Sequence, residues 1–117
     1  MVGRTGFDTR GFADQLAATV RFAQKLAVAQ RRDVFVSLTA SEATLCYDAA
    51  CATPAPGPGG EKPYTVSAPG GVAIAPATVL GFSAGGVPDI AGQLDIQVSG
   101  TGTHHVLVER ETGYVYD

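Results

Sequence analysis

The longest regular pattern in the chain lies in residues 12–32, where apolar side chains recur at the spacing of an α-helix. This stretch has no proline or glycine and is rich in alanine, so its helix propensity agrees with the spacing. We expect a surface helix whose apolar stripe seals a core. Asp14 in the first turn and Arg31 and Arg32 in the last would suit the helix dipole. The stripe contains Phe12, Ala13, Leu16, Val20, Ala23, Leu26 and Ala27, and the charged residues opposite it are Asp14, Arg21, Lys25 and Arg32.

Length and composition indicate one globular domain. The chain has 117 residues, 45% of them hydrophobic, enough to bury roughly two-thirds of its extended surface. A net charge of −3 argues against non-specific nucleic-acid binding. No apolar run reaches the roughly 18 residues of a membrane span, and no secretory signal is present. Residues 1–5 look like a start codon followed by a cloning scar, so we expect one native domain at residues 6–117 and a segment removed upstream.

After residue 33 the apolar period changes from 3.6 to 2, which indicates β-strands. Residues 34–38 and 43–47 predict a hairpin. Residues 94–99 alternate apolar and polar side chains, as is typical of an antiparallel strand with one face in water. We therefore predict an α+β fold, in which the long N-terminal helix packs on one or two antiparallel β-sheets within residues 34–117. Further short strands are expected at residues 64–66, 72–75, 79–83, 103–109 and 114–116.

The stretch from residue 48 to residue 63 interleaves prolines with glycines. Such a density opposes a β-ladder, because proline lacks the N–H donor and glycine weakens a strand. We expect a flexible loop at residues 48–63. A variable contact surface is the alternative, since binding often occurs on loops that a rigid scaffold carries.

No residue pattern in the sequence predicts catalysis, a metal site or a cofactor, so we expect no enzyme. His104 and His105 are adjacent, and neighbours on a strand point to opposite faces, so their rings cannot easily share one metal ion. Ser37, Ser83 and Ser99 lie in no G-x-S-x-G context, and the glycine-rich stretches lack the known phosphate-binding patterns. The remaining candidate carboxylates are interpreted as solvated strand and turn residues: Asp89, Asp95, Glu109 and Glu111.

Two cysteines, Cys46 and Cys51, are separated by four residues in a polar loop. A zinc half-site would need two more soft ligands, and apart from the histidines the sequence offers none. A local disulfide between Cys46 and Cys51 is therefore favoured, and it would place the domain in an oxidising compartment.

Three stretches match known protein segments in one consistent order. Residues 16–38, LAATVRFAQKLAVAQRRDVFVSL, combine a helix that ends in basic residues with a valine-rich strand, although Arg21-Phe22-Ala23 replaces the commoner Ala-Arg order. Residues 80–86, LGFSAGG, form a strand and turn. Residues 94–116, which contain VERETGYV, form closing strands. Together these stretches resemble the GspH/FimT family of minor pilins and pseudopilins, and they cover most of the chain outside the 48–63 loop.

The resemblance implies a pilin-like fold and a precursor with a short leader, which a prepilin peptidase cleaves before the new N-terminus is methylated. It also implies a hydrophobic N-terminal helix, missing here, that anchors the full-length protein once in the bacterial inner membrane and packs in the filament core. The domain would face the periplasm until it joins a filament with other minor and major pilins or pseudopilins.

The expected function is that of a minor pilin, a structural and assembly subunit at or near the tip of a type IV pilus-like filament. One alternative is a minor pseudopilin of a type II secretion system. Another is a DNA- or ligand-binding minor pilin used in uptake or adhesion. Some FimT-type members are thought to bind DNA through basic residues near the C-terminus. This chain ends in Asp117, and its Arg110 is flanked by two glutamates, so nucleic-acid binding is not expected.

Overall fold

The two periodicities of the sequence become one helix and a series of strands. The computed structural model describes residues 2–60, 62, 64–90, 92–100 and 102–116, with side chains from residue 9 onward. Helix α1 covers Val2–Gln30, and the later regular elements in the described ranges are strands. The strands are β1 (Val34–Leu38), β2 (Glu42–Cys46), β3 (Thr65–Ser67), β4 (Ala73–Ala75), β5 (Val79–Phe82), β6 (Leu94–Gly100), β7 (Gly102–Val108) and β8 (Val115–Tyr116).

Helix α1 begins at Val2 and not at the predicted residue 12. The added stretch contains glycines but no proline, and a helix that is already nucleated extends at little cost. Residues 2–5, which the sequence suggested to be a scar, continue this helix, and their origin stays a prediction.

The helix ends at Gln30, two residues before the predicted Arg32. Arg31 adopts a left-handed backbone with a φ of 52°, and its N–H donates to the carbonyl of Val28. The next N–H, of Arg32, donates to the carbonyl of Ala27. These two bonds form a Schellman motif, which terminates a helix. The predicted dipole pairing is therefore wrong, because the first turn holds no acidic residue and the last turn no basic one.

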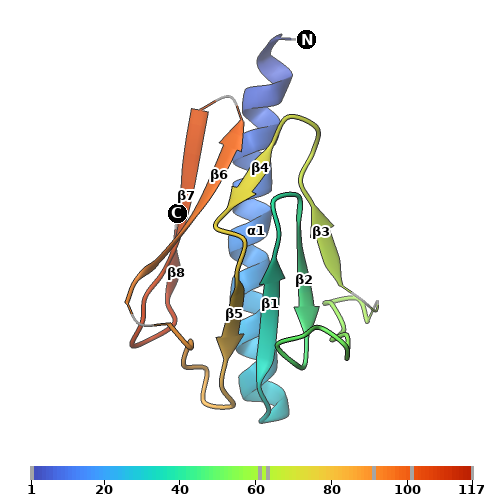
Figure 1. Cartoon of the computed structure of the whole chain (residues 1–117), viewed down its shortest axis with the longest axis vertical. Coiled ribbons are helices and arrows are strands. Elements are labelled where there is room, and N and C mark those ends of the chain that lie inside the picture. The colour runs from blue at the N-terminus through green and yellow to red at the C-terminus, as the bar shows by residue number, and fades with distance from the viewer. Residues whose placement is uncertain (1, 61, 63, 91, 101, 117) are drawn as a thin grey trace.

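The strands form two antiparallel sheets of four strands each (Figure 1). Their orders are β3-β2-β1-β5 and β4-β6-β7-β8. The predicted hairpin is confirmed, with Val36 opposite Leu45. In the second sheet β6 pairs with β7, so that Ile96 lies opposite Val106. The predicted α+β fold, a long helix on antiparallel sheets, is confirmed.

Helix α1 contacts strands of both sheets and lies against one shared core (Figure 1). The predicted stripe is buried except for Leu26, which is partly buried. Because sheets pack against more than one side of the helix, burial extends past the stripe to Ala17 and Thr19. Thr19 satisfies its hydroxyl locally by donating to the Gln15 carbonyl at 2.8 Å.

The turn between β1 and β2 links the two sheets. The carbonyl of Ala40 accepts the N–H of Ile74 in β4 at 2.9 Å, and the carbonyl of Ser41 accepts the N–H of Ala68 at 2.7 Å. The Thr39 hydroxyl accepts the N–H of Glu42 at 3.1 Å, which stabilises the turn itself. The bond to Ile74 therefore joins the two sheets, in addition to the shared core, whereas the bond to Ala68 extends the pairing of β2 with β3.

Candidate functional site

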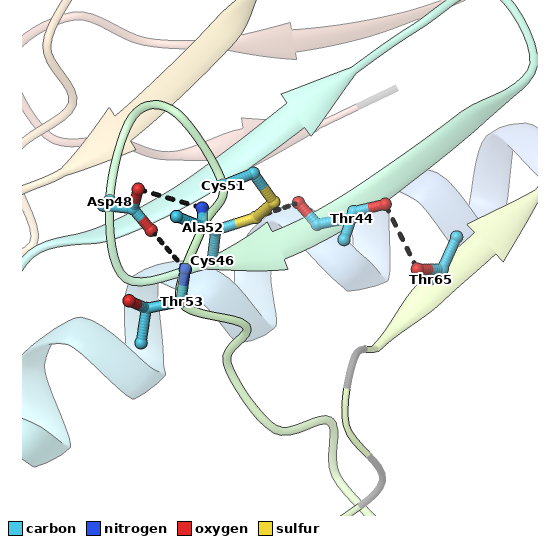
Figure 2. Close-up of a disulfide and its surroundings, with 7 residues drawn as sticks. All are labelled: Thr44, Cys46, Asp48, Cys51, Ala52, Thr53 and Thr65. Carbon is cyan, nitrogen blue, oxygen red and sulfur yellow. Dashed lines mark hydrogen bonds between the residues drawn. A yellow bond between two sulfur atoms is a disulfide. The ribbon is translucent and has the colours of Figure 1, made fainter.

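The two cysteines close a small ring at the end of β2 (Figure 2). Cys46 is the last residue of β2 and is buried, so it does not lie in a polar loop as the sequence suggested. It forms a disulfide with Cys51, with 5.0 Å between the two Cα atoms. Inside the ring, the Asp48 carboxylate accepts the N–H groups of Ala52 at 2.9 Å and Thr53 at 2.7 Å. These hydrogen bonds lower the pKa of Asp48.

The loop that we expected to be flexible is attached to the core beyond this ring. Ala55 is fully buried; its N–H donates to the Leu45 carbonyl at 3.0 Å, and its carbonyl accepts the Tyr64 N–H at 3.4 Å. Ala55 lies between two prolines, but its own N–H is free to pair, which the proline count alone obscured. Residues 61 and 63 of this loop lie outside the described residues.

The adjacent histidines differ in exposure, although both line one hollow. His104 is half-buried, whereas His105 is exposed and its Nδ1 lies 2.8 Å from an Asp95 carboxylate oxygen. Asp95 is thus paired, and the sequence prediction of a merely solvated carboxylate was incomplete. Both histidines line a hollow of about 280 Å³ beside Arg10 and Asp14 of helix α1. The described residues contain no group of three or more metal-ligating side chains.

The structure gives three further candidate residues individual surroundings. Ser83 accepts the N–H of Val87 at 3.3 Å and shapes a turn. Asp89 lines a second hollow, of about 340 Å³, next to Phe35. Glu109, also predicted to be solvated, instead bonds to Gln93 and Tyr116.

A junction between the helix and two turns was not predicted from the sequence. The side-chain amide of Gln24 donates to the carbonyls of Gly86 and Thr112, each at 2.9 Å. Gly86 follows β5 of the first sheet, and Thr112 lies in the turn between β7 and β8 of the second. We call Gln24, Gly86, Thr112 and Gly113 the helix–turn junction. The junction brings together the LGFSAGG and VERETGYV stretches, which are far apart in the sequence.

The junction leaves no room for a side chain at Gly113. A Cβ there would approach the Gln24 amide nitrogen and lie 2.9 Å from the Gly86 carbonyl oxygen, and the φ of 70° already favours glycine. One helical turn earlier, the Arg21 guanidinium donates to the Val115 carbonyl from Nε at 3.2 Å and from Nη2 at 3.0 Å. The helix therefore satisfies backbone carbonyls of β8 and of both turns with its own side chains.

The N-terminal end of helix α1 extends beyond both sheets (Figure 1). Its 29 residues correspond to about 43 Å at the standard helical rise, close to the 45 Å long axis of the molecule. A strip of the helix that includes Asp14, Ala18 and Lys25 stays exposed. None of the described helical residues forms a segment with the length and hydropathy of a membrane span.

A long helix that lies on antiparallel sheets and projects from one end of them is the architecture of type IV pilin-like proteins. Among solved structures, the chain is similar to the type IV minor pilin FimU of Pseudomonas aeruginosa. The match has a TM-score of 0.73 and 15% sequence identity, and it covers 92% of this chain and 85% of FimU. At this identity the likeness shows the fold alone. No family model and no curated protein matches the sequence.

Proposed function

We propose that this chain is the head domain of a minor pilin, a non-enzymatic subunit that assembles with other minor and major pilins at or near the tip of a type IV pilus-like filament. The full-length protein would carry an apolar helical segment ahead of Gly6 that crosses the bacterial inner membrane, with this domain in the periplasm. A prepilin peptidase would process the precursor, and its new N-terminus would be methylated.

The observation that carries the proposal is the position of helix α1. The helix runs the length of the domain, its inner stripe is buried against both sheets, and its N-terminal end projects past them (Figure 1). A helix end that projects past the sheets can continue into a longer rod. The pilin-like fold and the disulfide of an oxidising compartment support the same role.

The exposed strip of the helix is the surface that would meet neighbouring subunits. Ala18 is small and exposed, so another helix could approach it closely, while Asp14 and Lys25 provide charge at either side. Association through this strip would leave the core untouched. The strip can therefore be altered without unfolding the domain.

The decisive experiment compares two genes in a strain that lacks the native one. The full-length gene should restore filaments, and residues 6–117 secreted alone to the periplasm should not, although the domain folds. The native gene should encode an apolar stretch of about 20 residues directly before Gly6. Full rescue by the free domain would mean that it acts as a periplasmic binder, and the pilin proposal would fail. A defect in protein secretion with normal pili would instead identify a pseudopilin.

A surface variant tests the helix strip itself. In the full-length protein, Ala18→Trp should abolish filament incorporation while changing the free energy of unfolding by no more than about 0.5 kcal/mol, because residue 18 is exposed. Ala49→Trp, at an exposed position within the disulfide ring, is the matched control and should assemble normally. Equal assembly of both variants would exclude the strip as a contact surface.

A further inference from the structure

One hollow has features that subunit assembly does not require. The segments that line it lie at the end of the sheets remote from the helix N-terminus (Figure 1). It has a volume of about 380 Å³ and lies between the segment before β6 and the turn that joins β7 to β8. In an assembly that buries the projecting helix, this end of the domain would stay accessible. Its lining residues are Gly92, Gln93, Glu109, Arg110, Glu111 and Thr112.

Two lining residues, Gln93 and Glu109, and the neighbouring Tyr116 are joined by hydrogen bonds. The Gln93 amide donates to Oε1 of Glu109 at 2.6 Å and to the Tyr116 hydroxyl at 2.8 Å. The Tyr116 hydroxyl donates to the same Glu109 oxygen at 2.8 Å. The hydrogen bond to Glu109 raises the pKa of Tyr116, so the phenol stays protonated and continues to donate. These bonds leave the second carboxylate oxygen of Glu109, Oε2, as an acceptor.

An exposed aromatic ring adjoins this polar group. Tyr114 is 64% exposed and stacks on Tyr116, with 5.5 Å between the ring centroids and 25° between their planes. The turn fixes Tyr114, because its N–H donates to the Thr112 hydroxyl at 3.1 Å and its carbonyl accepts the Glu109 N–H at 2.9 Å. These bonds hold the backbone of Tyr114, and its ring, stacked on Tyr116, still faces solvent, where it can contact a ligand.

We propose that this hollow and the Tyr114 ring together form a saccharide-binding site. A pyranose presents an apolar C–H face, which suits an aromatic ring, and a rim of hydroxyl groups that both donate and accept hydrogen bonds. Glu109 supplies an acceptor and Arg110 donors at the edge of the hollow, while Gln93 holds the Glu109 carboxylate in place. This combination of one apolar surface and a few fixed polar groups is typical of small-molecule sites.

Other ligand classes fit these residues less well. Two glutamates at the hollow oppose the phosphates of a nucleic acid, which requires a net positive surface. A divalent cation would use the carboxylates but not the stacked rings, and the described residues contain no metal-ligating cluster. The site does not depend on filament assembly, so it can be tested on the isolated chain and can fail independently of the proposed function.

The test is a titration of the ¹⁵N-labelled 117-residue chain with the methyl glycosides of glucose, galactose, mannose and N-acetylglucosamine, followed by NMR. At least one glycoside should cause saturable shifts of the Gly92, Glu111 and Gly113 amide signals. Tyr114→Ala should raise its Kd by at least about tenfold, whereas Tyr114→Phe, which keeps the ring, should change it by less than about threefold. Val79→Ala, which removes an exposed apolar side chain on the other sheet, is the control and should leave the Kd unchanged.

A second variant separates binding from stability. Glu109→Gln keeps the size of the side chain and should raise the Kd of the same glycoside by about tenfold. Its thermal unfolding midpoint should not change. The proposal is overturned if no glycoside gives saturable shifts, if the shifts map away from the hollow, or if Tyr114→Ala binds like the unaltered chain. The proposal would also be overturned if an oligothymidine shifted these signals saturably and no glycoside did.

Discussion

Replacing Gln24 by alanine tests whether the helix–turn junction holds the two sheets on the helix. The variant removes two hydrogen bonds, to the Gly86 and Thr112 carbonyls. The bond to Thr112 is exposed, so water can largely replace it, whereas Gly86 is buried. A net hydrogen bond contributes about 1 kcal/mol, and a buried carbonyl left unpaired costs about 1 to 3 kcal/mol. We therefore expect Gln24→Ala to lower the free energy of unfolding by about 2 kcal/mol.

Urea denaturation at fixed pH measures this difference, provided that the slope of the transition does not change. Gln24→Glu is the sharper variant, because it keeps the shape and replaces the donating NH₂ by a carboxylate that faces two carbonyl oxygens. It should destabilise the domain at neutral pH at least as much as alanine does. Lys25→Ala, one residue along and exposed, is the control and should stay within about 0.5 kcal/mol of the unaltered chain.

The reasoning is refuted if Gln24→Ala and Lys25→Ala unfold at the same urea concentration, or if Gln24→Glu is as stable as the unaltered chain. A double-mutant cycle with Gly113→Ala extends the test. The added Cβ would collide with the Gln24 amide, so part of its cost should vanish when Gln24 is already alanine. The contact with the Gly86 carbonyl and the positive φ remain in both backgrounds, so the cost should not vanish entirely.

Four further outcomes are expected. Leu16→Asp should cost several kcal/mol in urea denaturation, since it places an unpaired charge at a fully buried position. Thiol titration of oxidatively purified protein should find no free thiol, and reducing the Cys46–Cys51 bond should lower stability by at most about 2 to 3 kcal/mol without unfolding the domain. Arg31→Gly should raise the free energy of unfolding by up to about 1 kcal/mol, because glycine adopts the φ of 52° without strain. The lowered pKa of Asp48 means that its contribution to stability is complete above the ordinary value of 3.8 and is lost as the pH falls through the lowered value, so Asp48→Asn should reduce the acid dependence of thermal melts in this range.

The helix stripe and the strands could be predicted because most of their buried side chains repeat the period of the element. The helix end could not, since it depends on a left-handed backbone at Arg31, a residue type with no preference for that conformation. Ala55 was missed for a related reason: the composition of a loop does not reveal which of its N–H groups reaches the core.

Gln24 left a usable signal in the sequence. It follows Val20 by four residues and precedes Ala27 by three, so the helical period places it beside the apolar stripe. A polar side chain at such a position requires a hydrogen-bond partner. The partners themselves could not be predicted, because they lie in turns of two different sheets, and only the packed fold brings those turns together.

Strand register predicts the contacts of Asp95 and Glu109. The glycines at 100 and 102 indicate a tight turn, and once Gly100 is placed opposite Gly102 each further pair steps outward by one residue on both strands. That register puts Asp95 opposite Leu107 and therefore diagonal to His105 on the solvent face, where the ion pair is found. Continued past the end of the ladder, it puts Gln93 opposite Glu109, the two residues that share a hydrogen bond at the rim of the proposed saccharide site. The turn between β6 and β7 thus determines the position of that site. Shortening or lengthening this turn by one residue should shift the register and separate Gln93 from Glu109, even if both strands still form.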